Sequence, residues 1–467
     1  MSIVASQRQL SRVHFVGVAG SGMAGIAYVA HKSGIRVSGS DLHVSSYVEP
    51  LLAAGAEVVI GHSAANLTDG DIELVVASSA VPSTNPELIC AHERGIEVWP
   101  RARMLAYLGQ DHEVLAVSGT HGKTTTSAML ATALIELGAD PSFLIGGVVN
   151  SLNTSAHLAT GAYIVMEADE SDASFTWLNP NVAIVTNIEA DHMDHFESLE
   201  EIEHSFLAFL DKLDPAGIAI VCADSPGLKE LAQQSDKPFI TYGSRIDADV
   251  RLVLEPRPQV VFADGSRFDL TVPASPGIHN LLNATAVMAA LDWLGFDRQE
   301  SVQSLRNFSG VHRRFDCIGA AAGVQVIDDY GHHPTEVSAT LAAARQQSFE
   351  QVHLLFQPHR YTRTQAFIHE FARAFDDADT ITLMEIYTAG ETAITGIDSN
   401  RLLRAIKEHK PTTRVRLISQ RHDVAQAMAE LAQPGSVIIT MGAGDVTYLA
   451  PEILDELQLK EGRSEPV

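Results

Sequence analysis

The chain has 467 residues, 46% of them hydrophobic, and its 58 acidic and 32 basic residues give a formal net charge of −26. This length predicts about three domains, and the net charge argues against nucleic acid as a partner, because phosphate backbones require clustered lysine and arginine. No apolar run approaches the roughly 20 residues of a membrane-spanning helix, and residues 1–12 lack a signal-peptide core, so we expect a cytoplasmic protein without membrane insertion.

The first predicted elements form a βαβ unit with a glycine-rich turn. The two strands and the helix between them lie at 13–18, 36–40 and 23–33. The turn has the pattern G-x-G-x-x-G at Gly20, Gly22 and Gly25, and Asp41 ends the second strand. Such glycines let a pyrophosphate approach the backbone, and the acidic residue is placed to bind a ribose. The pattern alone would indicate NAD, but the same geometry can hold the diphosphate of a UDP-sugar.

A further strand at 74–79 ends in Ser79, and a helix opens after Asn85. The polar serine at the carboxyl end of a parallel strand lies where ligands bind in such sheets. We expect the first domain to end near residues 107–111.

The most informative stretch is Gly119-Thr120-His121-Gly122-Lys123-Thr124-Thr125, between an apolar strand at 114–117 and a helix that extends to Gly138. Strand, glycine turn and helix in this order build a phosphate site, because backbone N–H groups crowd an oxyanion at the start of the helix. Lys123 can reach the β- and γ-phosphates of a nucleotide, and the Thr124 hydroxyl can bind Mg²⁺. The usual P-loop pattern has a glycine where this chain has Val117, so this is a shortened variant. The alternative is an ordinary turn with a chance Gly-Lys-Thr.

Acidic and histidine residues follow two further apolar strands, at 162–166 and 182–186. Glu167 comes directly after the first strand, and His192 lies in a polar run after the second. Carboxyl ends of parallel strands meet at one edge of a sheet, so we expect both residues to join Lys123 and Thr124 around one cavity. Thr124, Glu167 and His192 are therefore predicted to bind the Mg²⁺ that an ATP site requires. The alternatives are a solvated acidic loop for Glu167, and surface residues or a zinc-like cluster for His192.

A β-rich stretch interrupted by proline and glycine residues follows to about residue 275. A helix then begins, with Asn280 and Asn283 in its first turns. Amides there can bind the edge of adenine, with helix capping by Asn280 as the alternative. Beyond this helix, Arg313 and Arg314 lie where the chain passes into a new series of strands and helices. Two adjacent arginines at such a boundary can clamp phosphates.

The rest of the chain predicts another doubly wound domain of alternating strands and helices. The strands lie at 324–327, 352–356, 380–384 and 436–440, and the helices near 336–345, 366–375, 400–409 and 423–432. Polar side chains at the strand ends include Asp329, Tyr330, His332, His359, Arg360 and Arg363. We expect residues 461–467 to lack regular structure.

These motifs together resemble those of the Mur ligase family, ATP-dependent enzymes that add amino acids during peptidoglycan precursor synthesis. Among them, the chain is most similar to the members that add L-alanine to UDP-N-acetylmuramate. The resemblance covers essentially the whole chain and rests on Gly17…Gly25, Gly119–Thr125, Glu167–Ser171, Asn187…Asp194, His279-Asn280…Asn283, His312–Phe315, Asp328…Pro334 and Gln357…Thr364. It implies an α/β fold of three domains: an N-terminal Rossmann-like domain for the UDP-sugar at 1–109, a central P-loop ATPase-type domain with a parallel or mixed sheet at 110–312, and a C-terminal Rossmann-like domain for the amino acid at 313–467.

The resemblance also implies roles for single residues. The substrate-binding residues would be Gly20, Gly22 and Gly25 at the diphosphate, Asp41 and Ser79 near the nucleoside, and His359, Arg360 and Arg363 at carboxylates of the substrate or of alanine. The nucleotide-binding residues would be Gly119, Thr120, Gly122, Lys123, Thr124, Thr125, Asn280, Arg314, Asp329 and Tyr330. The catalytic set would be Lys123, Glu167, His192, Arg314 and His332.

The expected cofactors are ATP and Mg²⁺, and the expected substrates are UDP-N-acetylmuramate and L-alanine, bound by a monomer or a homodimer. A carboxylate attacks the γ-phosphorus of ATP to give an acyl phosphate, and an amine then displaces phosphate. Phosphoryl transfer depends mostly on positioning and charge neutralisation, which Lys123, Arg314 and Mg²⁺ would supply. The incoming ammonium must lose a proton, and His332, His333 and His359 are candidates to accept it by their pKa class. The alternative is that these histidines are packed or face a phosphate, so no single base is assigned.

Three alternatives stay open. A ligase that attaches a ready-made tripeptide to UDP-N-acetylmuramate during cell-wall recycling carries similar motifs, and acceptor specificity would separate the two. An NAD-dependent dehydrogenase would explain the first domain but leaves Lys123 and Glu167 without a role. A non-enzymatic nucleotide-binding switch would not release phosphate in response to both substrates.

Overall fold

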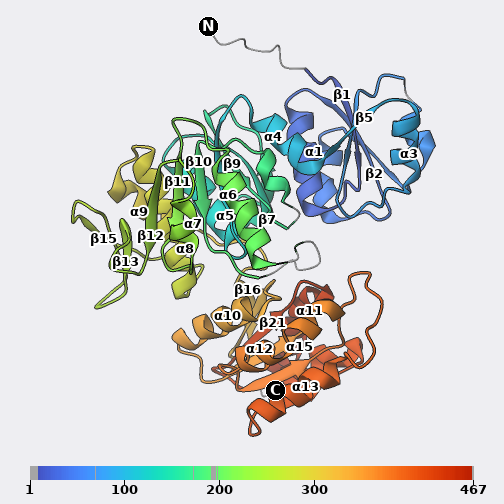
Figure 1. Cartoon of the computed structure of the whole chain (residues 1–467). Helices are drawn as coiled ribbons and strands as arrows, with labels where there is room; N and C mark the ends of the chain where they lie inside the picture. Colours follow the sequence, from blue (N-terminus) through green and yellow to red (C-terminus); the bar gives the residue numbers. More distant parts are fainter. Residues whose placement is uncertain (1–8, 69, 172, 191–195, 197, 465–467) are drawn as a thin grey trace. The chain divides into compact units, whose positions relative to one another are not determined.

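The computed structural model describes residues 9–68, 70–171, 173–190, 196 and 198–464, so the predicted metal ligand His192 lies outside the described residues. The described residues fold into two compact units, which we describe separately (Figure 1). The first unit contains the chain up to Thr271 and Leu282–Phe308, and the second contains Val272–Leu281 and the chain from Ser309. No helix in the described part of the chain is both long enough and apolar enough to cross a membrane.

The first sheet of the first unit is entirely parallel. Its strands lie in the order β3 (Glu57–Ile60), β2 (Arg36–Asp41), β1 (Arg12–Val16), β4 (Leu74–Ala77), β5 (Glu97–Pro100). The accompanying helices are α1 (Ser21–Lys32), α2 (Glu49–Ala53), α3 (Pro86–Glu93) and α4 (Arg101–Gly109). Figure 1 shows α1 and α3 on opposite sides of this sheet. Helices on both faces bury the strands between them, and every residue of β1 is buried, Arg12 and His14 included.

The second sheet of the first unit carries the phosphate loop. Its strands lie in the order β15 (Arg267–Asp269), β14 (Gln259–Val261), β13 (Val250–Val253), β12 (Phe239–Gly243), β11 (Ile218–Cys222), β10 (Val182–Val185), β6 (Glu113–Ser118), β9 (Tyr163–Glu167), β7 (Ser142–Val149), β8 (Thr154–His157). The helices are α5 (Lys123–Glu136), α6 (Leu199–Leu210), α7 (Leu228–Ala232), α8 (Ile278–Trp293) and α9 (Arg298–Arg306). The strands from β13 to β7 pair in parallel, whereas β14, β15 and β8 are antiparallel to their neighbours. The predicted mixed sheet is therefore confirmed.

The register at the centre of this sheet places the predicted site residues on neighbouring strands. Val117 of β6 pairs with Glu167 of β9, and Ser118 pairs with Val185 of β10. All three strands run in parallel and end at the same edge. The phosphate loop, the acidic run that starts at Glu167 and the polar run after β10 therefore leave the sheet side by side.

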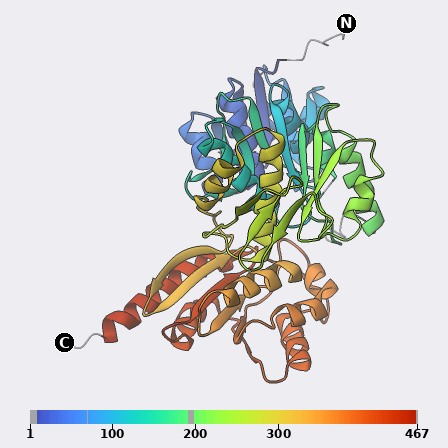
Figure 2. The same ribbon diagram turned by 90° about the vertical axis from the view of Figure 1, so that its left-hand side faces the viewer.

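The second unit is a doubly wound domain with one antiparallel edge strand. Its strands lie in the order β16 (Asp316–Ala321), β17 (Val324–Asp329), β21 (Val437–Met441), β18 (Val352–Phe356), β19 (Thr380–Leu383), β20 (Arg414–Leu417). Its helices are α10 (Pro334–Gln346), α11 (Tyr361–Ala366), α12 (Ile368–Ala374), α13 (Ser399–His409), α14 (Val424–Leu431) and α15 (Leu449–Ser464). Figure 2 shows α15 lying along the β16–β17 hairpin.

The helix expected near 366–375 is confirmed as α12, and a short helix that was not expected, α11, precedes it and meets it at Phe367. One other expectation for this unit differs from the structure. Residues 461–464 were expected to lack regular structure but continue α15, whose apolar side chains Leu449, Ile453 and Leu457 are fully buried. Packing of the preceding turns holds the helix in place, and its last turn adds backbone hydrogen bonds at little further cost in entropy.

Candidate functional site

The phosphate loop between β6 and α5 has a backbone that only glycine tolerates at two positions. Gly119 has φ +130° and Gly122 has φ +84°. A Cβ added at Gly119 would lie 2.1 Å from Thr186 Oγ1, and one added at Gly122 would lie 2.8 Å from Asn283 Oδ1. Gly122 also caps α5, and no side chain caps this helix end. The first N–H groups of α5 are thus aimed out of the helix, in the arrangement that binds phosphate.

The polar run after β10 holds this loop in shape. Asn187 accepts the N–H of His121 through its side-chain oxygen at 2.8 Å and the N–H of Thr120 through its carbonyl at 3.0 Å. The Thr186 hydroxyl donates to the His121 carbonyl at 2.5 Å. The loop is therefore preorganised by its neighbour strand, which is what positioning of a triphosphate requires.

Lys123 lies inside this loop and pairs with a carboxylate from the acidic run after β9. Its ammonium donates to the Gly119 carbonyl at 2.6 Å and lies 2.8 Å from Glu170 Oε2. The Glu170 side chain is 2% exposed and that of Lys123 is 13% exposed. Burial alone would lower the pKa of Lys123, but the carboxylates of Glu170 and Asp169 outweigh burial and raise it. The lysine is therefore a permanent cation at the base of the loop.

The predicted metal ligands Thr124 and Glu167 contact each other directly. The Thr124 hydroxyl donates to Glu167 Oε1 at 3.1 Å, and the N–H of Gly146 on β7 donates to Glu167 Oε2 at 2.7 Å. A hydroxyl and a carboxylate oxygen at this separation are hard oxygen donors of the kind that Mg²⁺ prefers. The side chains of Thr124 and Glu167 thus fit a magnesium ion, and His192 lies outside the described residues.

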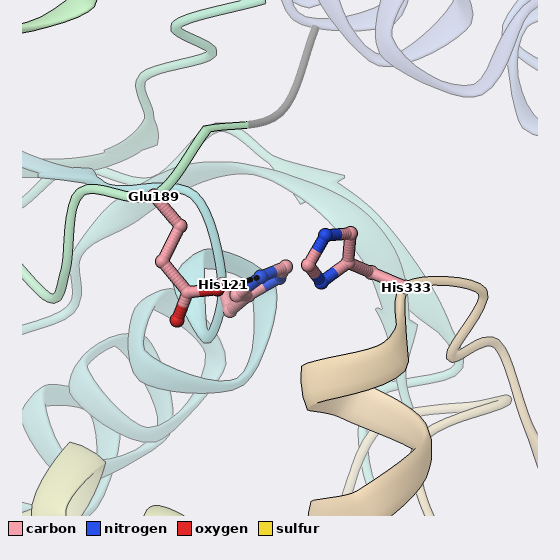
Figure 3. A group of neighbouring side chains, drawn as sticks. All are labelled: His121, Glu189 and His333. Atoms are coloured by element: carbon pink, nitrogen blue, oxygen red, sulfur yellow. Dashed lines mark ion pairs between the residues drawn. The ribbon is translucent and has the colours of Figure 1, made fainter. Parts of the chain in front are cut away.

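His121 of the loop lies beside Glu189. The two side chains approach to 3.5 Å between Nε2 and Oε2, as the dashed line in Figure 3 marks. His333, also labelled in Figure 3, belongs to the second unit, where its ring accepts the N–H of Thr335 and caps α10. This cap gives His333 a structural role at the start of α10.

The glycine-rich turn of the first sheet is closed by Asp41. The carboxylate of Asp41 accepts the N–H of Ala19 at 2.8 Å, and Gly20 caps α1 without help from any side chain. Ser79 lies exposed beyond the carboxyl end of β4. Gly25 is buried on α1, where an added Cβ would lie 3.2 Å from Ala156 of β8. The structure thus gives Gly25 a role in packing α1 onto the second sheet, and its contact with a diphosphate stays a prediction.

Asn280 and Asn283 of α8 have different surroundings. The Asn280 side-chain amide donates to the Pro276 carbonyl at 3.0 Å, a local bond to the preceding turn. Asn283 lies against Gly122 of the phosphate loop. The assignment of Asn280 to adenine stays a prediction, while the position of Asn283 at the loop follows from the structure.

In the second unit, Asp329 is buried beneath the predicted arginine. It accepts the N–H groups of Phe315 and Gly331, each at 2.8 Å. Burial raises its pKa to about 6, against the opposing charge of Arg314. Arg314 lies 5.1 Å above the Tyr330 ring and 3.6 Å from Glu336. Asp329 thus shapes the turn that presents Arg314 and Tyr330, and its contact with a nucleotide stays a prediction.

Four rings form a row at the carboxyl edge of the third sheet. Tyr330, His332, His359 and Tyr387 lie in this order, with centroid separations of 5.3, 5.7 and 5.6 Å. Arg363 Nη1 lies 3.4 Å from His359 Nδ1, and Arg360 begins α11 with φ +67°. Burial, with the charges of Arg363 and Arg360, lowers the pKa of His359 to about 4. The imidazole is therefore neutral at neutral pH, beside two guanidinium groups that can bind a carboxylate.

The sequence did not indicate that three residues, Arg101, Glu170 and Tyr387, would contact the predicted site residues. Glu170 stands in the acidic run after β9, but nothing in that run shows which carboxylate faces Lys123. Arg101 and Tyr387 lie outside any recognisable motif. Tyr387 pairs with the backbone of the 358–360 segment through its own N–H and carbonyl, each at 2.8 Å. Only strand pairing in the folded sheet places it beside His359.

Comparison with known proteins finds relatives over nearly the whole chain. Residues 12–113 match the model of the Mur ligase family catalytic domain, 117–291 the Mur ligase middle domain, and 313–444 the Mur ligase glutamate ligase domain. A UDP-N-acetylmuramate–L-alanine ligase of Anaeromyxobacter dehalogenans is 43% identical over 465 residues, which is 98% of this chain and 100% of that relative. One of Geotalea daltonii is 41% identical over 456 residues, 96% of this chain and 99% of that relative.

Solved structures show the same fold. The UDP-N-acetylmuramate-alanine ligase of Thermotoga maritima superposes with a TM-score of 0.78 at 28% identity, covering 96% of this chain and 99% of that one. A murein peptide ligase of Psychrobacter arcticus superposes with a TM-score of 0.71 at 24% identity, with the same coverage, and shows the fold alone. The three consecutive domain matches and the full-length identity leave one conclusion: the chain belongs to the Mur ligase family.

Proposed function

We propose that this chain is an ATP-dependent ligase that joins L-alanine to UDP-N-acetylmuramate, the step that begins the peptide of the peptidoglycan precursor. The observation that carries the proposal is the phosphate loop, in which Lys123, Thr124 and Glu167 converge from two neighbouring strands. The chain is 43% identical to a relative named UDP-N-acetylmuramate–L-alanine ligase, which supports the choice of acid and amino acid.

The first step forms an acyl phosphate. The muramate carboxylate attacks the γ-phosphorus of ATP, and ADP leaves. Lys123 neutralises charge on the β- and γ-phosphates, and the open N–H groups of α5 bind the phosphate oxygens. Thr124, Glu167 and His192 are the proposed ligands of Mg²⁺, which would supply further charge neutralisation when bound. Arg314 is proposed to bind the γ-phosphate.

The second step forms the amide. The amino group of alanine attacks the acyl carbonyl, and phosphate leaves from the tetrahedral intermediate. We propose that Arg360 and Arg363 bind the alanine carboxylate, a geometry that guanidinium groups favour. His332 borders the same site and is the proposed acceptor of the ammonium proton, because the lowered pKa of His359 makes that ring the weaker base.

The remaining parts of the proposal follow from composition and fold. Residues 1–109 would bind the UDP-sugar, 110–312 ATP, and 313–467 the amino acid. We propose a cytoplasmic monomer or homodimer. We also propose that it has no affinity for nucleic acid, since the chain has a net charge of −26.

The test is phosphate release from ATP with UDP-N-acetylmuramate and a panel of acceptors. We expect release with L-alanine and none when either the sugar nucleotide or the amino acid is omitted. Faster turnover with a tripeptide than with L-alanine would instead assign the chain to cell-wall recycling. Substrate-independent release would indicate a nucleotide switch, and binding of NAD(H) would support the dehydrogenase reading of the first domain.

A further inference from the structure

We propose that Arg101 is a further ligand of the substrate diphosphate, held in place by Asp169, and that it links the sugar-nucleotide site to the phosphate loop. The inference rests on the proposed function, because it takes the diphosphate of the UDP-sugar to bind at the glycine-rich turn that begins α1.

Arg101 lies directly on this turn. It is the first residue of α4, immediately after β5. A Cβ added at Gly22 would lie 3.3 Å from Arg101 Nη1, so the guanidinium packs against the bare backbone of the turn. Gly22 is therefore required not only for the approach of a ligand but also for the approach of this side chain. The Arg101 side chain is 20% exposed, so part of its guanidinium is accessible to a ligand.

The other end of the guanidinium is fixed by Asp169. Arg101 Nη2 forms an ion pair with Asp169 Oδ2, while Asp169 Oδ1 accepts the N–H of Ser171 at 3.1 Å. Asp169 thus holds one edge of the guanidinium. The planar group then presents its remaining N–H donors toward the turn.

A diphosphate at the turn carries more negative charge than the start of one helix offsets. The N-terminus of α1 supplies only about half an elementary charge, and the chain as a whole is strongly acidic. Arginine suits this position, because its fork of N–H groups matches two phosphate oxygens at once. The same carboxylate run that orients Arg101 also contains Glu170, the partner of Lys123.

The test compares a ligand that carries the diphosphate with one that lacks it. Calorimetry measures the binding of UDP and of uridine to wild type, Arg101→Met and Arg101→Lys. The affinity of uridine is obtained from its displacement of UDP. Methionine keeps the aliphatic part of the side chain, and lysine keeps the charge but loses the fork. We expect Arg101→Met to weaken UDP binding about 10- to 100-fold, the loss of a charge-assisted hydrogen bond, and to leave uridine binding unchanged. The affinity of Arg101→Lys for UDP should lie between those of wild type and Arg101→Met.

Arg103→Ala is the matched control. Arg103 stands on the same helix, but its guanidinium lies 4.3 Å above the Trp99 ring and pairs with Glu97 at 2.9 Å. We expect this variant to bind UDP as tightly as wild type. Asp169→Asn should weaken UDP binding but not uridine binding, since it releases the guanidinium without removing it.

The outcomes separate the inference from the function on which it rests. If wild type does not bind UDP, the proposed function fails. If wild type binds UDP and Arg101→Met binds it equally tightly, Arg101 is not a diphosphate ligand. An equal loss of UDP and uridine affinity in Arg101→Met would show that Arg101 merely supports the fold of the site.

Discussion

The ion pair between Lys123 and Glu170 gives Lys123 two separable roles, one in stability and one in phosphate binding. We consider Lys123→Met, Glu170→Gln and the double variant. At 2.8 Å, the Coulomb attraction is about 6 kcal/mol for an effective dielectric constant of about 20. Much of this offsets the cost of removing both charges from water. Breaking one side of such a buried pair leaves the other charge uncompensated, which costs about 3–5 kcal/mol.

We therefore expect each single variant to lower the free energy of unfolding of the first unit by about 3–5 kcal/mol. The double variant should recover most of this loss, because no lone charge is then buried. A deficit of about 1–2 kcal/mol should persist in the double variant, because the lysine also donates to the carbonyls of Gly119 and Thr120. Activity should behave differently, since Lys123→Met and the double variant both lack the cation at the phosphates and should release no phosphate.

Urea unfolding followed by tryptophan fluorescence is a suited assay. The three tryptophans of the chain, Trp99, Trp177 and Trp293, all lie in the first unit, so the signal reports the unit that contains the pair. Phosphate release with UDP-N-acetylmuramate and L-alanine is measured on the same samples. If the double variant is less stable than both single variants, the pair is not a compensated buried one. Near wild-type phosphate release by Lys123→Met would refute the phosphate-loop assignment.

Three further predictions concern the metal, the amino acid and acid stability. Glu167→Gln should raise the Mg²⁺ concentration for half-maximal activity at least about tenfold, because the amide keeps the Thr124 contact but loses the charge; an unchanged Mg²⁺ titration would remove Glu167 from the metal site. Arg360→Ala should raise the KM for L-alanine about 10- to 100-fold with the KM for ATP unchanged, and identical kinetics would place the amino-acid site elsewhere. Glu87 is fully buried, and hydrogen bonds from His14, Ser40 and Asn66 outweigh burial and lower its pKa from 4.5 to about 2. A lowered carboxyl pKa stabilises the fold above pH 4.5 and is lost as the pH falls toward 2, so Glu87→Gln should cost about 3 kcal/mol at pH 7 and flatten the acid limb of unfolding; an unaltered acid limb would contradict this.

The parallel sheets were predictable because their strands are apolar on both faces. The strand at 114–117 and the one at 182–186 read as continuous apolar runs, and both are central strands of the second sheet. Polar residues directly after such strands must lie at one edge of the sheet, which made Thr124 and Glu167 predictable neighbours. The comparisons confirm the predicted α/β fold with its Rossmann-like and P-loop domains. They also confirm the predicted ligase family.

The short helix α11 was not predicted, because the apolar residues near 366–375 indicate only the helix that follows it, α12. Phe367, at which the two helices meet, adopts φ −115° and ψ 24°. Its ring lies 4.7 Å from the His333 ring at the start of α10. Phe367 thus packs against a residue more than 30 positions away, and no window of sequence contains that contact.

The sequence by itself determined which kinds of side chain stand at the ends of the strands, because alternation and glycine placement are local properties. It did not determine which partner each of several adjacent carboxylates contacts. Glu167 turns toward Thr124, Glu170 toward Lys123 and Asp169 toward Arg101. Beyond the end of a strand the direction of each side chain depends on packing. Arg101 and Asp169 are 68 positions apart, and only the folded chain brings them together.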